Sequence, residues 1–209
     1  MFEIFLFINP IGLYCYDIEN KVKKVIDNLE IDACCHFIPL ANVNVIQDDM
    51  IRRRMMAQKL GSFSYCTVAT NRALEEYHAI KIAYGNKKAR RFLRELQQKL
   101  NEEVAFCPLE LSEKVIQKLN LNVEKINQLR SSDYVKDSII QDRNLAAQWN
   151  IKKTPTTVIF NENDASESGI LLEGLINEDQ LANIFRPQPY IQPKNSFTEL
   201  FSANHLRLI

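Results

Sequence analysis

The sequence predicts an α/β fold in which two strand-containing segments are separated by a long helical one. Residues 1–8 are nearly all apolar and rich in aromatic and β-branched side chains, as in a central strand covered on both faces. Residues 45–150 show helical periodicity and no convincing strand, and strand character returns at residues 156–160. The 209 residues, 46% of them hydrophobic, suffice to bury a core without disulfides or metal ions.

The first segment is predicted to run strand, helix, strand. After the break at residues 9–12, a helix begins whose apolar stripe consists of Ile18, Val22, Val25, Ile26 and Leu29. Residues 31–40 then have strand character as far as the proline at 39. Because such crossovers are right-handed, the two strands should be parallel neighbours.

The central segment is predicted to contain several helices separated by short breaks. They cover approximately residues 47–60, 62–84, 89–104, 111–119, 123–129 and 132–149, with Asn122 as an N-cap. Residues 45–150 therefore form a helical insertion between the two parts of an α/β domain, residues 1–44 and 151–186.

The last segment returns to strands. Residues 156–160 and 169–174 are close enough to pair as a hairpin, and Asn177 should cap a final helix. Prolines at 187, 189 and 193 then introduce an extended tail, residues 187–209, which either packs back on the body or binds a partner. The order β-α-β, helices, β-β-α is the thioredoxin order with a helical domain inserted.

Charge and glycine content exclude several classes of function. The 26 basic and 26 acidic residues cancel, and no basic run exceeds Arg52–Arg54, so nucleic acid is not an expected partner. The five glycines have neither the spacing of a dinucleotide fingerprint nor that of a P-loop. No cofactor is therefore predicted.

The N-terminal apolar run is too short to span a membrane. It also lacks the basic start and the small-residue cleavage site of a signal peptide. The odd number of cysteines, five, agrees with an environment that keeps thiols reduced. The expected location is the cytoplasm, with no membrane partner.

Several segments together resemble the DsbA-like thioredoxin family: Asn9-Pro10 after a strand, the window Gly12-Leu13-Tyr14-Cys15 opening a helix, the helical insertion, and Lys153-Thr154-Pro155-Thr156 before a strand. Residues 79–87 and 91–97 are similar to the cytosolic YjbH/SpxH-type branch. In that branch, a DsbA-like protein presents the redox regulator Spx to the ClpXP protease. The resemblance thus implies a protein client, an Spx-like regulator, and the protease ClpXP as partners.

Redox members of the family carry Cys-x-x-Cys in the window, and the first cysteine attacks from the helix N-terminus as a stabilised thiolate. The resemblance places Gly12 in the attacking position and Cys15 in the resolving one, so no disulfide can form within the window. It also implies that Pro155 is cis and that the backbone of Thr154 is free to pair with an extended peptide. The predicted peptide-binding site consists of Gly12, Leu13, Tyr14, Cys15, Thr154 and Pro155.

Two functions follow from these residues. The first is an adaptor that binds an Spx-type regulator for ClpXP proteolysis, with Cys15 a half-buried thiol inherited from a redox ancestor. The second is a thiol-disulfide oxidoreductase or isomerase, or a glutathione-using relative, that works through Cys15 or another thiol. A kappa-type glutathione transferase is disfavoured because residues 11–16 contain no serine.

The remaining candidates are assigned to structure. Consecutive strand residues alternate between faces, so Cys34-Cys35-His36 should pack in the core, and no metal site is predicted. Cys66 and Cys107 are expected to be small buried hydrophobes, and His78 and His205 surface residues. The basic runs Arg52–Arg54 and Lys87–Arg91 are expected to be solvated helix faces; the alternative is a docking patch for an acidic partner.

Overall fold

The computed structural model describes residues 1–103, 107–162, 168–186 and 206–208. Its centre is a five-stranded sheet with the order β2-β1-β3-β4-β5. The strands are β1 (Phe2–Ile8), β2 (Ala33–Pro39), β3 (Thr156–Asn161), β4 (Ile170–Glu173) and β5 (Leu206–Leu208). Among the described strands, β1 and β2 alone pair in parallel, as the predicted crossover through α1 (Cys15–Leu29) requires.

The predicted helical insertion is confirmed between β2 and β3. It consists of α2 (Val43–Met55), α3 (Phe63–Tyr84), α4 (Asn86–Glu102), α5 (Pro108–Lys118), α6 (Val123–Arg130) and α7 (Asp133–Gln148). Asn122 caps α6 as predicted, since its side chain accepts a hydrogen bond from the backbone N–H of Lys125. Asn177 likewise caps α8 (Glu178–Phe185), in a capping box with Gln180.

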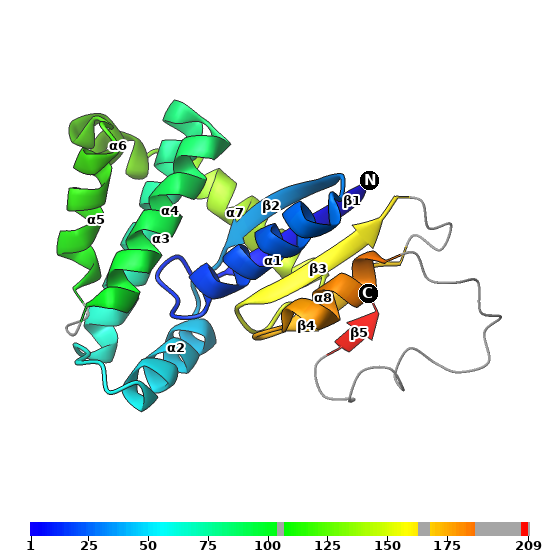
Figure 1. Cartoon of the computed structure of the whole chain (residues 1–209). Coiled ribbons are helices and arrows are strands. Elements are labelled where there is room, and N and C mark those ends of the chain that lie inside the picture. The colour runs from blue at the N-terminus through cyan, green and yellow to red at the C-terminus, as the bar shows by residue number, and fades with distance from the viewer. Residues whose placement is uncertain (104–106, 163–167, 187–205, 209) are drawn as a thin grey trace.

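The sheet is covered on both faces, which explains why β1 is apolar throughout. Ile4, Leu6 and Ile8 belong to a core cluster shared with α1, α3, α4 and α8. Phe7 packs on the opposite face, where Trp149 follows the end of α7. In Figure 1, α1 and α8 lie in front of the sheet, whereas α7 runs behind it.

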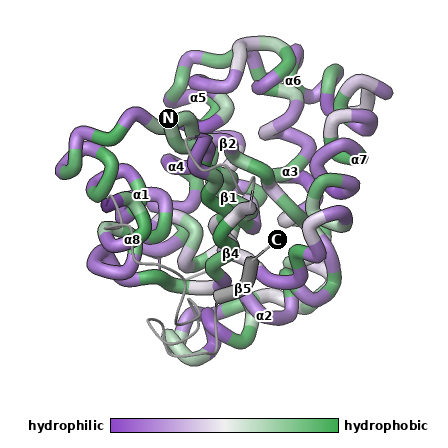
Figure 2. Tube along the Cα trace, turned by 90° about the vertical axis from the view of Figure 1, so that its right-hand side faces the viewer, coloured by the Kyte–Doolittle hydropathy of each residue, from purple (hydrophilic) through white to green (hydrophobic). Residues whose placement is uncertain are grey.

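The larger core is continuous between the sheet and the insertion. It joins Ile4 of β1 to Ile80 of α3 and to Leu96 of α4. In Figure 2, the strands form a hydrophobic centre, and hydrophilic residues recur along the outer helices. The predicted α/β fold with a helical insertion is thus confirmed.

The tail prediction falls mainly on residues 187–205 and 209, which lie outside the described residues. Residues 206–208 return to the body as β5, antiparallel to β4, with Leu208 opposite Ile170. For these three residues, packing back on the body is the alternative that the backbone pairing supports.

Candidate functional site

The loop between β1 and α1 is organised by the buried side chain of Asn9. Its Oδ1 accepts a hydrogen bond of 3.1 Å from the backbone N–H of Ile11, and its carbonyl accepts one of 3.0 Å from that of Gly12. The helix consequently begins at Cys15, with Tyr14 as its N-cap. The predicted break at residues 9–12 is present, and the helix begins at the last residue of the window, because the Asn9 turn occupies its first part.

Gly12 and Cys15 face each other across this turn. A Cβ atom placed on Gly12 would lie 2.8 Å from Sγ of Cys15 and 2.9 Å from Cβ of Asn9. A side chain at position 12 would therefore point directly at the thiol, which is the relationship expected of the two positions of a dithiol window. The glycine lets the Cys15 thiol fill that space.

The Cys15 thiol is buried and protonated at neutral pH. Its residue is only 2% exposed, and burial raises the pKa of the thiol to about 12, with a further increase from Asp49. A hydrogen bond between the Cys15 thiol and the backbone of Asn9 lowers the pKa, as do the charges of Arg52 and Arg53, but these effects do not offset burial. Because the thiolate is the nucleophile in disulfide exchange, Cys15 is not an activated attacking group.

The peptide bond between Thr154 and Pro155 is cis, as predicted. Both residues are buried, and Nη1 of Arg52 donates a hydrogen bond of 2.7 Å to the Thr154 carbonyl. The Arg52 guanidinium also lies 5.5 Å from the centre of the Tyr14 ring. Arg52 thus connects the window to the cis-proline loop.

The backbone of this region is bonded to the chain's own side chains. The carbonyl of Thr154 accepts one hydrogen bond from Arg52, so the backbone that was expected to pair with a peptide is partly engaged within the chain. In the window, Leu13 N–H donates to Asp49 over 2.7 Å, and Asn101 donates to the Leu13 carbonyl over 2.8 Å. Several backbone groups to which an extended peptide would bond therefore already have hydrogen-bond partners within the chain.

A buried ion pair on α2 supports the loop. Nε of Arg53 donates to Asp49 over 2.8 Å, and Nη2 of Arg53 donates to the Ile11 carbonyl over 2.5 Å. Arg53 is 0% exposed, so the prediction that the whole Arg52–Arg54 run is a solvated face is wrong for this residue. The i, i+4 spacing of Asp49 and Arg53 could have indicated the ion pair from the sequence. The hydrogen bond to the Ile11 carbonyl, 42 positions away, has no sequence signal.

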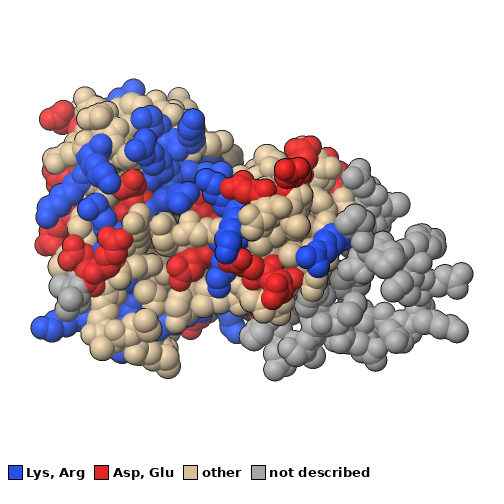
Figure 3. All heavy atoms as spheres, in the orientation of Figure 1, with Lys and Arg blue, Asp and Glu red and all other residues tan. Residues whose placement is uncertain are grey.

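A groove of about 730 Å³ lies between α1, α4 and the outer strand β2. Apolar side chains, among them Leu6, Val22 and Phe37, contribute to its lining. Basic residues outnumber acidic ones in the lining of the groove. The basic residues are Lys23, Lys87, Arg90, Arg91 and Arg94, and the acidic residues are Glu19 and Glu95. Figure 3 shows Lys and Arg side chains gathered over α4 and the neighbouring end of α1.

The arginines of the groove are partly held by one buried acid. Glu19 lies 3.6 Å from Nη2 of Arg90 and 3.8 Å from Nε of Arg94. Burial raises the pKa of Glu19, and the two arginines act in the opposite direction. The Arg90 guanidinium also lies 4.0 Å from the centre of the Phe37 ring. Lys87 and Arg91 are exposed, as the sequence predicted.

His78 is buried, so its prediction as a surface residue is wrong. Nδ1 lies 2.9 Å from the Ser138 hydroxyl and Nε2 lies 3.5 Å from Asp142, both on α7. Burial, with help from Lys81, lowers the pKa of His78 to about 3. The neutral ring therefore links α3 to α7. His205 lies outside the described residues.

The cysteines are distributed differently from the prediction. All five are free, and Cys66 is buried as expected, whereas Cys107 and Cys35 are half-buried and Cys34 is exposed. The expectation that Cys34-Cys35-His36 packs in the core is thus wrong for Cys34. Residues 34 and 36 share one face of β2, and Glu3 of β1 joins them there, a grouping that reasoning from consecutive residues missed.

Within the described part of the chain, no helix combines the length and the apolar character needed to cross a membrane.

The comparison with family models shows that residues 5–183 match the family described as Thioredoxin. The comparison with curated proteins found no match.

Solved structures with a similar fold come from bacterial redox proteins. A protein assigned as a protein disulfide isomerase from Nitrosomonas europaea has a TM-score of 0.61 at 13% identity, over 88% of this chain and 95% of that one. A thioredoxin-like oxidoreductase from Silicibacter pomeroyi DSS-3 has a TM-score of 0.59 at 14% identity, over 87% and 83%. The thiol-disulfide exchange protein alpha-DsbA2 from Wolbachia pipientis has a TM-score of 0.58 at 14% identity, over 88% and 80%. The fold is that of DsbA-like thiol-disulfide oxidoreductases.

Proposed function

Because the chain belongs to the thioredoxin family but carries glycine in the place of the attacking cysteine, we propose that it binds a protein client and does not exchange disulfides. The client is an Spx-type redox regulator, which the chain presents to the ClpXP protease in the cytoplasm. One observation carries the loss of redox function: Cys15, the thiol left in the window, is buried and has a pKa of about 12. A protonated, enclosed thiol does not attack a disulfide.

The groove between α1, α4 and β2 supports client binding better than the window does. The window and the cis-proline loop present few free backbone groups, since Arg52, Asp49, Arg53 and Asn101 occupy them. By contrast, β2 is an outer strand of the sheet: among the described strands it pairs with β1 alone, although the Phe37 carbonyl accepts a hydrogen bond from Tyr77 of α3. A client segment can add to such an edge as a further strand.

Charge specifies the kind of segment that fits the groove. Lys87 and Arg91 are exposed on its rim, and the nearest buried acid, Glu19, already interacts with Arg90 and Arg94. An acidic segment would pair with the exposed Lys87 and Arg91. The client therefore docks through an acidic stretch on this groove.

Reversing the rim charges should weaken client binding. The double variant Lys87→Glu/Arg91→Glu is expected to bind a purified Spx-type regulator about tenfold more weakly, since each exposed pair contributes up to about 1 kcal/mol and reversal adds repulsion. Isothermal titration calorimetry measures the affinity, and the half-life of the regulator with ClpXP measures its presentation.

The matched control is Arg143→Glu, an exposed arginine on α7 that does not line the groove. It should leave both the affinity and the half-life unchanged. If the wild type neither binds the regulator nor shortens its half-life, the adaptor function is wrong. If the double variant binds as the wild type does, the client docks elsewhere.

The oxidoreductase alternative is favoured by the activities named for the similar structures. Insulin reduction by the wild type, with a two-cysteine thioredoxin as positive control, distinguishes the two functions. We expect no turnover above background, and no difference between the wild type and Cys15→Ser, because the buried thiol is protonated. Turnover that Cys15→Ser abolishes would establish the enzymatic alternative.

A further inference from the structure

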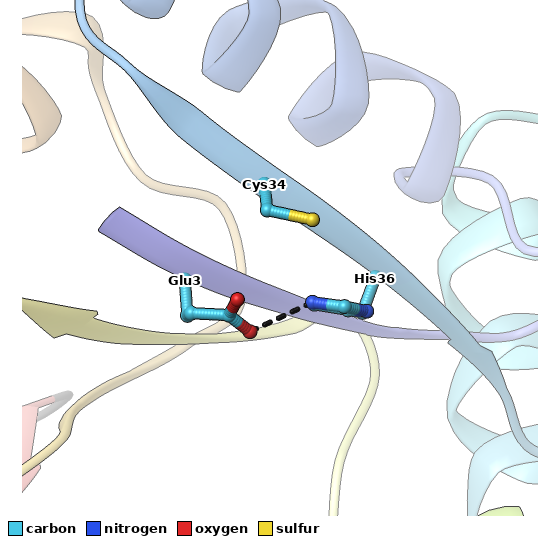
Figure 4. Close-up of side chains that lie close together, drawn as sticks. All are labelled: Glu3, Cys34 and His36. Atoms are coloured by element: carbon cyan, nitrogen blue, oxygen red, sulfur yellow. Dashed lines mark hydrogen bonds and ion pairs between the residues drawn. The ribbon is translucent and has the colours of Figure 1, made fainter. Parts of the chain in front are cut away.

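Three side chains with metal-binding atoms meet on the sheet face opposite the groove. Glu3 of β1 pairs directly with Cys34 of β2, and His36 follows two residues later on the same face of β2. Their ligand atoms, a carboxylate oxygen, the thiol sulfur and an imidazole nitrogen, all lie within 4.8 Å of one another. Figure 4 shows the three side chains converging between the two strands.

These separations are close to those of a metal site. With bonds of about 2.3 Å to sulfur and about 2.0–2.2 Å to nitrogen and oxygen, the ligand atoms of a tetrahedral zinc ion lie roughly 3.3–3.8 Å apart. Oε2 of Glu3 and Nε2 of His36 are 2.8 Å apart, so a metal ion would replace that hydrogen bond and move the two atoms slightly outward.

The surroundings hold one ligand in place and leave the others accessible. The ring of His36 stacks on Phe5, with ring centres 4.6 Å apart and an angle of 18° between the planes. The side chains of His36 and Glu3 are 39% and 29% exposed, and Cys34 is exposed. An ion can therefore reach the cluster from solvent, and water can occupy a fourth position.

We propose that Glu3, Cys34 and His36 form a three-ligand binding site for Zn²⁺. The combination of thiolate, imidazole and carboxylate is that of zinc sites, whereas Mg²⁺ and Ca²⁺ prefer oxygen ligands alone. Binding forms a zinc–sulfur bond and releases the thiol proton to solvent, so the ion exchanges for a proton with no change of oxidation state. The ion would join the outer strand β2 to β1.

The test uses the purified full chain in metal-free buffer. Zn²⁺ is titrated by calorimetry, and Co²⁺, a spectroscopic substitute for zinc, reports a thiolate ligand through a sulfur-to-metal charge-transfer band. We expect one equivalent to bind, an increase in the thermal unfolding temperature with zinc, and a charge-transfer band with cobalt. Cys34→Ser and His36→Gln should each weaken binding tenfold or more, and Cys34→Ser should abolish the band.

The matched control is Cys35→Ser, the adjacent thiol on the opposite face of β2. It should keep the affinity and the cobalt band of the wild type. Far-UV circular dichroism tests whether each variant is folded. We expect it to be, because the side chains of Cys34 and His36 are exposed to solvent at least in part. The absence of a charge-transfer band, or zinc affinity that is unchanged in Cys34→Ser, would overturn the proposal.

Discussion

Replacing Gly12 by cysteine is expected to give the window a dithiol that the wild type lacks. The Cβ atom of residue 12 would lie 2.8 Å from Sγ of Cys15, and a disulfide with an S–S bond of about 2.05 Å places these two atoms about 3 Å apart. The new Cβ also comes within 2.9 Å of Cβ of Asn9, so the loop around Asn9 must shift to accept it. The new thiol can then pair with Cys15.

Thiol titration and mass spectrometry of oxidised Gly12→Cys should reveal a disulfide between residues 12 and 15. Insulin reduction should rise from background to at least about tenfold above it, since the pair now supplies both an attacking and a resolving thiol. Gly12→Ala is the control: it adds the same Cβ without a thiol and should remain inactive. If oxidised Gly12→Cys contains no such disulfide, the assignment of Gly12 and Cys15 as a former dithiol pair is wrong.

Replacing Arg53 by methionine is expected to give the largest loss of stability. The change leaves the Asp49 carboxylate without its buried partner and the Ile11 carbonyl without its donor. Breaking a buried ion pair by removing one partner costs about 3–5 kcal/mol, because the remaining charge is uncompensated. For a chain of this size, the thermal midpoint should fall by roughly 10 °C.

Thermal and urea unfolding, followed by circular dichroism, measure this loss. Arg54→Met, which changes the exposed neighbour on the same helix, should alter the unfolding free energy by less than about 0.5 kcal/mol. Adding Asp49→Asn to Arg53→Met should recover part of the loss, because the buried charge is then removed while an oxygen remains for Leu13 N–H. Equal losses in the Arg53 and Arg54 variants would contradict the role of the pair.

The window position Gly12 and the ion pair that supports the loop differ in how far the sequence predicts them. The glycine at position 12 is read directly from the sequence, and the resemblance to DsbA-like proteins identifies its position as that of the attacking cysteine. The support of the loop depends on Asp49 and Arg53, which the sequence places some 40 residues away from the backbone groups they bind. The run Arg52–Arg54 looked like a uniform basic surface, yet its members have three environments: one bonds the cis-proline loop, one is buried, and one is exposed.

The order of the elements, the helical insertion and the caps at Asn122 and Asn177 could be predicted from the sequence, and the resemblance to DsbA-like proteins assigned Gly12 to the attacking position of the window. These features depend on local periodicity, turn chemistry and residue identity, which act over a few positions. The sequence could not predict which side chains bond the loop backbone, how deeply Cys15 is buried, or that Glu3 lies beside Cys34 and His36. The reason is physical: strand register and helix packing bring together atoms from distant segments, and burial, which sets the pKa of Cys15, exists only once those segments have packed.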